Sequence, residues 1–306
     1  MVRFAVRLLV FASFFFIYDK VFIIVAHRSA EAEVDKRLEY VVKGEMSKDI
    51  IIAGSSTGSR DIIAGKIAQE TGLSAYNLCY PGSDVEFHEF VIKTLVQFNK
   101  PPRMILFVVD DNTEFLDSES IIYRKDRLYP LIKYPHIRKE LESRQGDNSF
   151  FSSLLILDRL NKYNLDLRRK RFTVLDTIIA CGSMPISWKP ENIRFSYDSQ
   201  ERNYPLDNEN PEKIVAFREI IKTCNSNNIK LVFVFPPIYK AHSKSFESRI
   251  RELGGNDAFY YVYNSENPVY KDEDYYYDEI HLLRKGAEVF TQELVSYIHH
   301  LIERDT

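Results

Sequence analysis

Residues 49–56 read Asp-Ile-Ile-Ile-Ala-Gly-Ser-Ser, and this stretch decides the fold. The run at 49–53 is short and, after its first residue, apolar and rich in β-branched side chains. Such a run is typical of a parallel strand buried on both faces. Gly54, Ser55 and Ser56 then end the strand at a turn of small residues that carries hydroxyl groups. Ligands of open parallel sheets bind beyond the carboxyl ends of the strands, so this turn is the first candidate site.

Strands and helices alternate on both sides of this stretch. Further strands are expected at 75–78, 104–109, 230–235 and 259–263. Helices are expected at 59–71, 84–98, 211–225, 243–253 and 284–303. Alternation of this kind predicts an α/β fold with a parallel sheet and helices on both of its faces.

The pattern changes between about residue 115 and residue 205, where Tyr, Arg, Lys and Asp are frequent and strand character is low. A helical stretch is expected near 150–164. We interpret 115–205 as a largely helical insertion over the carboxyl edge of the sheet, within a domain that spans 49–306. Insertions at this edge commonly shape substrate access, although a plain packing layer is the alternative.

The composition excludes several classes of protein. Among 306 residues, 45% are hydrophobic and 28% are charged, which is the balance of a folded globular chain. A net charge of −3 with dispersed basic residues gives no case for nucleic acid, and the basic run at 168–171 is read as a solvated helix face. Cys79, Cys181 and Cys224 are too few and too scattered for a disulfide framework or a zinc site. We expect three buried thiols, with a single bridge as the alternative.

The N-terminal residues 4–26 are strongly apolar, but Asp19 and Lys20 interrupt them. The unbroken core at 8–18 has the length of the apolar region of a signal peptide, whereas adding 21–26 gives enough residues to cross a bilayer. A charged residue deep in a bilayer costs roughly 2.5–3.5 kcal/mol on insertion scales. Adjacent opposite charges offset part of this cost.

Three interpretations of residues 1–30 follow: an uncleaved signal anchor with its N-terminus inside, a cleaved signal peptide, or a buried globular helix. We favour the anchor, followed by a charged, helical stalk at 31–48. The anchor places the protein at the inner or cytoplasmic membrane with its body extracytoplasmic (periplasmic). A cleaved peptide makes the protein secreted.

Polar residues follow each of the first three predicted strands. Ser56 lies in the turn between the first strand and the helix expected at 59–71, and a hydroxyl at the start of a helix gains from the helix dipole; a helix cap is the alternative. Gly82 follows the second strand, and its N–H is suited to a developing oxyanion, or else it serves only a tight turn. Asn112 follows the third strand, where its amide is a second candidate oxyanion donor or an Asx cap.

Two other kinds of site, a nucleotide-binding loop and a metal site, fit these turns poorly. Residues 54–58 lack the Gly-Lys-Ser/Thr ending of a phosphate-binding P-loop and the spacing of a dinucleotide fingerprint. Asp110, Asp111 and Glu114 suit a hard metal ion, but the His and carboxylate spacing of a closed site is missing. We therefore expect neither a cofactor nor a metal.

Near the other end of the chain, Asp278-Glu279-Ile280-His281 precedes the last predicted helix. At a spacing of three, in a loop or a first turn, the carboxylate and the imidazole can face the same side. A lone histidine is usually structural, but the predicted architecture brings His281 to the edge of the sheet where Ser56 lies. Ser56, His281 and Asp278 then supply a nucleophile, a base and an orienting acid for acyl transfer.

In chain order, these four sites resemble the sequence blocks of the SGNH, or GDSL-type, hydrolase superfamily. The Gly-Asp-Ser block of that family matches 54–56, its second-block Gly matches Gly82, and its Asp-x-x-His matches 278–281. Its Gly-x-Asn-Asp block matches 110–113 with only the Asn kept. The similarity spans roughly 49–304, around the insertion. It implies a three-layer α/β/α architecture with a flavodoxin-like parallel sheet.

The resemblance also implies a role for each site residue. Ser56 corresponds to the nucleophile, His281 to the base and Asp278 to the acid. The oxyanion donors would be the N–H of Ser56, the N–H of Gly82 and the amide of Asn112. The block alignment favours Ser56 over Ser55 as the attacking hydroxyl.

One difference from the usual sequence blocks points to a particular branch of the family. Ser55 stands where the first block usually has Asp, a replacement familiar in the divergent, membrane-anchored branch that resembles accessory proteins of alginate O-acetylation and lipoteichoic-acid alanylation. Such proteins work with a membrane-bound O-acyltransferase that exports activated acyl groups. For this chain the branch implies an envelope glycan as substrate and a membrane-bound O-acyltransferase as partner.

We therefore expect an extracytoplasmic, membrane-tethered serine O-acyltransferase or esterase that acts on a cell-envelope polysaccharide through an acyl-serine intermediate. A non-catalytic scaffold or glycan-binding component of such a modification system is the alternative, because the second and third blocks are eroded. A secreted lipase or general esterase is a third hypothesis.

Overall fold

A computed structural model describes residues 2–109, 113–145, 171, 173 and 175–303. The chain divides into two compact units. The first comprises Met1–Val42 and Arg124–Arg171, and the second comprises Lys43–Tyr123 and Phe172–Thr306. Each unit is described by itself.

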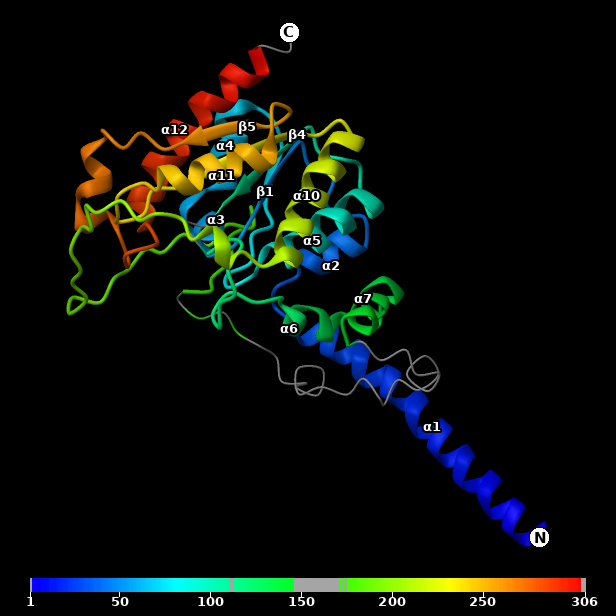
Figure 1. The fold of residues 1–306 in the computed structure, drawn as a ribbon. Helices are drawn as coiled ribbons and strands as arrows, with labels where there is room; N and C mark the ends of the chain where they lie inside the picture. The colour runs from blue at the N-terminus through cyan, green and yellow to red at the C-terminus, as the bar shows by residue number, and fades with distance from the viewer. Residues whose placement is uncertain (1, 110–112, 146–170, 172, 174, 304–306) are drawn as a thin grey trace. The chain divides into compact units, whose positions relative to one another are not determined.

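The second unit is built on a parallel sheet of five strands (Figure 1). These strands are β1 (Ile50–Ala53), β2 (Ala75–Asn77), β3 (Met104–Val108), β4 (Lys230–Phe235) and β5 (Phe259–Val262). Their order in the sheet is β2-β1-β3-β4-β5, and every neighbouring pair is parallel. Because the chain leaves β1 for one neighbour and later returns to its other side, the topological switch lies between β1 and β3, where α/β sheets bind ligands. The predicted α/β fold and its five strands are confirmed.

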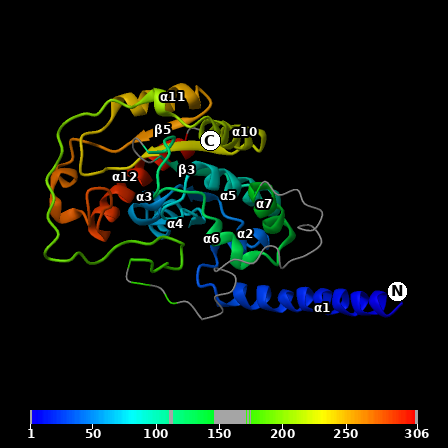
Figure 2. The same ribbon diagram turned by 60° about the horizontal axis from the view of Figure 1, so that its bottom comes forward.

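Two helix layers flank this sheet. Its long and short helices are α3 (Ser56–Asp61), α4 (Ala64–Thr71), α5 (Val85–Phe98), α10 (Pro211–Ser226), α11 (Lys244–Gly254) and α12 (Arg284–Glu303), with single 3-10 turns η3 (Leu206–Asn208), η4 (Pro268–Lys271) and η5 (Glu273–Tyr275). Helix α12 packs against α3 and α4 (Figure 2), and α10 packs against α5 and α11. Ile50 and Ile52 join the core cluster that holds Phe290 of α12, whereas Phe107 contacts Phe217 of α10. Alternate strand residues thus face opposite layers.

The first predicted helix is wrong in one respect. The segment expected as one helix at 59–71 is two helices, because α3 begins at Ser56 and ends before an extended residue, Ile62. Backbone groups freed at this break find side-chain partners far along the chain. The N–H of Ile63 donates to Oγ1 of Thr291 at 3.0 Å, and the N–H of Ala64 donates to Oγ of Ser183 at 3.0 Å. These bonds make the break inexpensive.

The expected helical insertion is also partly wrong. Residues 175–205 contain no α-helix and run as irregular chain with isolated bridges. Their backbone bonds to other segments instead: Met184 N–H donates to the Ser59 carbonyl at 2.7 Å, and Cys181 accepts from the N–H of Asn77 at 2.9 Å. The helix predicted at 150–164 and residues 168–170 of the basic run lie outside the described residues.

The three cysteines are free. Cys79 and Cys224 are buried and Cys181 is half-buried. Burial raises the pKa of the Cys224 thiol to about 12, so this thiol stays protonated. The expectation of three buried thiols is confirmed for Cys79 and Cys224 and is wrong for the half-buried Cys181, and none of the three is bridged.

In the first unit, α1 (Val2–Ala32) is one unbroken helix. It is the one helix in the described part of the chain that is long and apolar enough to cross a membrane. Its large apolar side chains are mostly exposed, which contradicts the interpretation as a buried globular helix. Asp19 is buried and pairs with Lys20 at 3.1 Å, so the two interrupting charges neutralise one another. The helix is consistent with a signal anchor or a signal sequence.

Among the described residues of the first unit, the other helices are short: α2 (Arg37–Val42), α6 (Lys125–Leu128), η1 (Tyr129–Leu131) and α7 (Pro135–Gln145). Helix α1 packs against η1. Glu39 accepts a hydrogen bond from the Tyr134 hydroxyl at 2.7 Å and pairs with Lys133 at 3.2 Å. Glu39 is therefore held by partners within this unit.

Candidate active site

Ser56 is the first residue of α3, directly after the turn that ends β1. The helix cap is Ser55, not Ser56. The hydroxyl oxygen of Ser56 lies 2.8 Å from Nε2 of His281, across 225 residues of sequence. The alternative in which Ser56 serves as the cap of α3 is therefore wrong. Its hydroxyl instead makes a hydrogen bond with the imidazole of His281.

Two glycines allow α3 to start this close to the sheet. Gly54 has a φ of +143°, and a Cβ built on it would lie 2.7 Å from the carbonyl oxygen of Val108 in β3. A Cβ on Gly58 would lie 2.5 Å from the sulfur of Cys79. Real Cβ atoms do not approach other atoms so closely, so any larger residue at either position pushes α3 and Ser56 outward.

His281 lies in the loop between η5 and α12, and Asp278 holds its ring. Nδ1 of His281 is 2.9 Å from both carboxylate oxygens of Asp278. Oδ1 of Asp278 also accepts the backbone N–H groups of Ile280 and His281, at 2.9 and 2.8 Å. This loop places the acid and the base three residues apart on one side, as the sequence predicts.

The charge on Asp278 decides where the proton of His281 lies. Burial alone would raise the pKa of Asp278, but the hydrogen bond and charge of His281 and the two backbone N–H groups outweigh it and hold the pKa below its usual range. An ionised carboxylate only accepts hydrogen bonds, so Nδ1 carries the proton. In a neutral ring Nε2 is then the acceptor for the hydroxyl of Ser56, which is the arrangement a general base requires.

Asp61 connects the helix that carries Ser56 to the loop that carries His281. The sequence gives no signal for this role of Asp61. Asp61 lies five residues after Ser56 at the end of α3 and is buried. Its Oδ1 accepts the N–H of Leu282 at 2.9 Å, one residue beyond His281. One short helix therefore carries Ser56 at its first residue and an anchor for the His281 loop at its last.

The three predicted oxyanion donors have different outcomes. The N–H of Ser56 is in the first turn of α3, where helix N–H groups lack intrahelical acceptors. Gly82 lies in the turn after β2 with a φ of +70°, and its carbonyl accepts the N–H of Ile122 at 3.1 Å. Gly82 itself is not among the residues that line the cavity next to Ser56. Asn112 lies outside the described residues.

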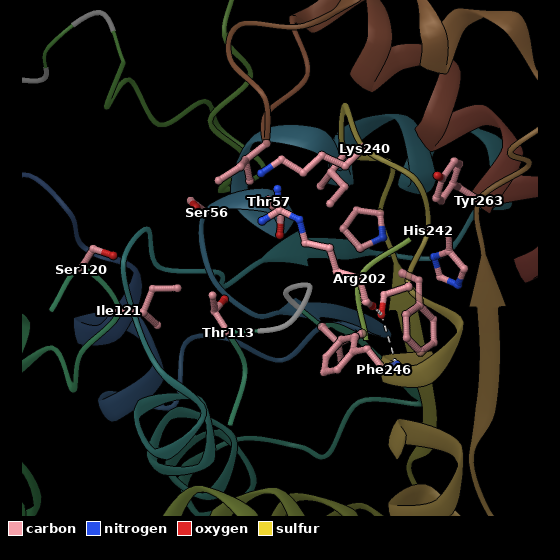
Figure 3. A pocket seen from close by; sticks show the side chains of 16 residues that line it. Ser56, Thr57, Thr113, Ser120, Ile121, Arg202, Lys240, His242, Phe246 and Tyr263 are labelled. Atoms are coloured by element: carbon pink, nitrogen blue, oxygen red, sulfur yellow. Dashed lines mark hydrogen bonds between the residues drawn. The ribbon is translucent and has the colours of Figure 1, made fainter. Parts of the chain in front are cut away.

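Ser56 opens into a cavity of about 300 Å³ beyond the carboxyl ends of β1, β3, β4 and β5 (Figure 3). The cavity is lined by Ser56, Thr57, Val109, Thr113, Ser120, Ile121, Arg202, Phe235, Pro236, Ile238, Lys240, His242, Ser243, Phe246, Tyr263 and Ile280. Ser120, Ile121 and Arg202 come from the predicted insertion. Because ligands of parallel sheets bind beyond the carboxyl ends of the strands, the sequence predicts where the cavity lies. It does not predict the lining residues that follow β4 and β5, because no familiar motif marks them.

A second serine–histidine pair lies away from this cavity. The hydroxyl oxygen of Ser83 is 2.7 Å from Nε2 of His88, and both side chains are fully buried. Nδ1 of His88 is 3.9 Å from Oε1 of Glu114, which is beyond hydrogen-bond distance. Burial lowers the pKa of His88 to about 3, so its ring is neutral.

Within the described residues, no group of three or more His, Cys, Asp or Glu side chains is placed to hold a metal ion.

Comparison with protein-family models found no matching family, and comparison with curated proteins found no match. The structure shows a parallel five-strand α/β sheet and an N-terminal apolar helix.

Proposed function

We propose that this protein is a serine O-acyltransferase or esterase of the SGNH type, tethered to a membrane and acting on a cell-envelope polysaccharide. The single observation that carries the proposal is the chain of hydrogen bonds from Ser56 through His281 to Asp278. In this chain the hydroxyl that lines the cavity can donate to the imidazole, and the imidazole donates to the carboxylate. Acyl transfer by a serine nucleophile requires this order of donors and acceptors.

In the proposed mechanism, Oγ of Ser56 attacks the carbonyl carbon of the acyl donor while Nε2 of His281 takes the hydroxyl proton. Asp278 stabilises the imidazolium that forms. The tetrahedral intermediate collapses, His281 returns the proton to the leaving oxygen, and the acyl group stays on Ser56. An acceptor hydroxyl, from a glycan or from water, then loses its proton to His281 and attacks the acyl carbon. The bond between that carbon and Oγ of Ser56 breaks, and His281 returns the proton to Oγ, which restores Ser56 and the neutral imidazole.

The developing negative charge needs hydrogen-bond donors. We assign this role to the N–H groups of Ser56 and Gly82 and to the amide of Asn112. Loss of one such donor typically lowers the rate by about 10²–10³-fold. The same residues serve hydrolysis and transfer, because only the second attacking hydroxyl differs.

One feature supports the envelope as the place of action. Helix α1 has the length and hydropathy of a membrane anchor or a signal sequence. In the anchored arrangement, a membrane-bound O-acyltransferase would supply the acyl group and an envelope glycan would receive it. The family is proposed on the residues of the four blocks, since the fold alone is shared by proteins of many functions.

A fluorophosphonate probe tests the proposal on the full chain in a non-ionic detergent. The probe should label Ser56 covalently, and Ser56→Ala should abolish the labelling while thermal unfolding is unchanged. Ser226→Ala, at an exposed position in α10, is the matched control and should label like the parent. Absence of label on Ser56 in a folded protein contradicts an acyl-serine mechanism and favours the scaffold alternative. Label on Ser55 instead would reassign the nucleophile.

A further inference from the structure

Helix α3, which begins with Ser56, is too short to hold its own position. It has six residues, whereas isolated helices of fewer than about 12–15 residues are marginal in water. The carbonyls of its last turn also lack partners within the helix. Other segments of the chain must therefore fix where Ser56 lies, and the hydrogen bonds to these carbonyls identify one of those segments.

Asn77, the last residue of β2, holds α3 from the sheet. Its side chain is fully buried. Nδ2 donates to the carbonyl of Gly58 at 2.8 Å and to the carbonyl of Ile62 at 3.1 Å. Oδ1 accepts the N–H of Cys79 at 3.0 Å. Both N–H donors of the amide and its oxygen are therefore bonded to backbone groups, which fixes the orientation of the amide.

The bonds to Gly58 and Cys79 connect two elements of the candidate active site. Gly58 lies on α3, two residues after Ser56. Cys79 begins the short segment that leads to Gly82. One buried side chain thus sets the spacing between the helix and the turn that carry the two backbone N–H groups assigned to the oxyanion, those of Ser56 and Gly82. The contact is tight, because a Cβ on Gly58 would lie 2.5 Å from the sulfur of Cys79.

The carbonyl of Ile62 has a second donor, which allows positioning to be separated from stability. Oγ of Ser183 donates to this carbonyl at 2.8 Å and accepts the N–H of Ala64 at 3.0 Å. These two bonds of Ser183 stabilise the break between α3 and α4. The bonds that Asn77 makes to the backbone on either side set the spacing of α3 from the segment after β2.

We propose that Asn77 is a positioning residue for acyl transfer, which holds Ser56 in place against His281 and against the N–H of Gly82. This inference rests on the proposed function and deepens it, because it adds a residue to the same site. A shift of α3 by about 1 Å would lengthen the 2.8 Å distance from Ser56 to His281 beyond hydrogen-bond range. A misplacement of this size lowers a catalysed rate by about 10²-fold.

Asn77→Asp tests the role of the amide in the full chain in a non-ionic detergent. The variant keeps an oxygen for the N–H of Cys79 but replaces Nδ2 with an oxygen that faces two carbonyls. We expect the rate of fluorophosphonate labelling of Ser56 to fall about 10²-fold. Asn99→Asp is the matched control, because Asn99 is also a buried amide bonded to two backbone groups, at the end of α5 on the amino edge of the sheet. Its labelling rate should change less than about threefold.

Ser183→Ala shows what loss of local stability alone does. It removes two bonds at the break behind Ser56, so it should lower the unfolding midpoint but change the labelling rate less than about threefold. Asn77→Ala should lower both quantities. Each rate is measured at least about 10 °C below the midpoint of that variant, where the protein is folded. A merely structural Asn77 would lower the midpoint and leave the labelling rate of the folded protein unchanged, which would overturn the proposal.

The nitrogen-15 chemical shift of Nε2 of His281 tests the positioning without any reaction. Ser56→Ala removes the hydroxyl that donates to Nε2 and so defines the shift of the broken contact, and His281→Gln assigns the signal. We expect Asn77→Asp to move the shift toward the value in Ser56→Ala. Asn99→Asp and Ser183→Ala should leave it at the parent value. An unmoved shift in Asn77→Asp would overturn the proposal.

The two measurements separate this inference from the proposed function. A parent protein whose Ser56 does not label, but whose His281 shift depends on Asn77, refutes the acyl-serine mechanism and supports the positioning of Ser56 by Asn77. A parent protein that labels, with a rate and a shift that do not depend on Asn77, refutes the positioning alone.

Discussion

Ser56–His281 and Ser83–His88 are two serine–histidine pairs in one compact unit, and their oxygen–nitrogen distances of 2.8 and 2.7 Å are almost equal. They differ in the third group and in access. His281 is held by a carboxylate at 2.9 Å and its serine lines a cavity, whereas Glu114 is 3.9 Å from His88 and both members of that pair are fully buried.

The difference teaches which features make such a pair suitable for chemistry. A short serine–histidine distance alone does not distinguish the two pairs. A carboxylate within hydrogen-bond distance fixes the tautomer and stabilises the imidazolium, and an open cavity admits a substrate. Without both, burial keeps His88 neutral and makes its bond to Ser83 a structural one.

The largest expected effect comes from breaking each pair at its histidine. His281→Gln should lower the rate of fluorophosphonate labelling of Ser56 by at least about 10⁴-fold, because the base is lost. His88→Gln keeps an amide group for Ser83 and should change that rate less than about threefold. Stopped-time labelling followed by mass spectrometry measures both rates. Equal losses in the two variants would remove the distinction between the pairs.

A smaller effect is expected from the link between the two halves of the site. Asp61→Ala removes the acceptor for the N–H of Leu282 and lets the His281 loop drift, which should lower the labelling rate about 10²-fold. Asp61→Asn retains a carbonyl oxygen at the same place and should restore most of the rate. A purely electrostatic role for Asp61 would instead make the Asn variant as slow as the Ala variant, and thermal unfolding of both variants checks that they are folded.

The smallest expected effect is the change with pH in the free energy of unfolding that comes from His88 of the buried pair. The pKa of His88 is about 3 in the folded protein and about 6.5 in an unfolded chain, so between these values the unfolded chain binds more protons. The free energy of unfolding therefore falls as pH falls, by roughly 1.4 kcal/mol per pH unit from this residue.

Urea unfolding at pH 7 and pH 5 measures this contribution, because carboxylates also destabilise at low pH and only a difference isolates His88. His88→Gln should lose less stability than the parent between the two pH values. His136 lies in the other unit and its pKa is lowered by burial in both proteins, so it cancels in the comparison. An unchanged pH dependence in His88→Gln would show that His88 is not buried in the neutral form.

Much of the sheet can be predicted because each strand carries its own signal. The β-branched runs around Ile51 and Val232 need no partner to be recognised, and the cap at Asp84 is visible as a local pattern: its carboxylate accepts the N–H of Phe87 at 2.9 Å. Ser56 and His281 are predictable for the same reason, since each lies in a short block beside a strand or helix end.

Features that depend on distant partners could not be predicted. The break at Ile62 depends on Thr291 and Ser183, which lie 228 and 119 residues from the groups they accept from. Residues 175–205 belong to the stretch that the sequence predicts to be largely helical, yet their backbone makes tertiary hydrogen bonds to β2 and α3 instead of helical ones. Arg202 lines the cavity close to a backbone bridge between Asp198 and Lys240, and no local pattern encodes that bridge.

The 225-residue separation between Ser56 and His281 has a consequence in time. A ribosome that adds about 5–20 residues per second produces the histidine roughly 10–45 s after the serine. Until the 278–282 loop packs against Asp61, Ser56 is an ordinary hydroxyl with no base beside it. If the proposed function and the signal-anchor arrangement hold, the nascent chain would cross the membrane as an unreactive intermediate. The hydroxyl would become nucleophilic only when the segment holding His281 had arrived on the same side.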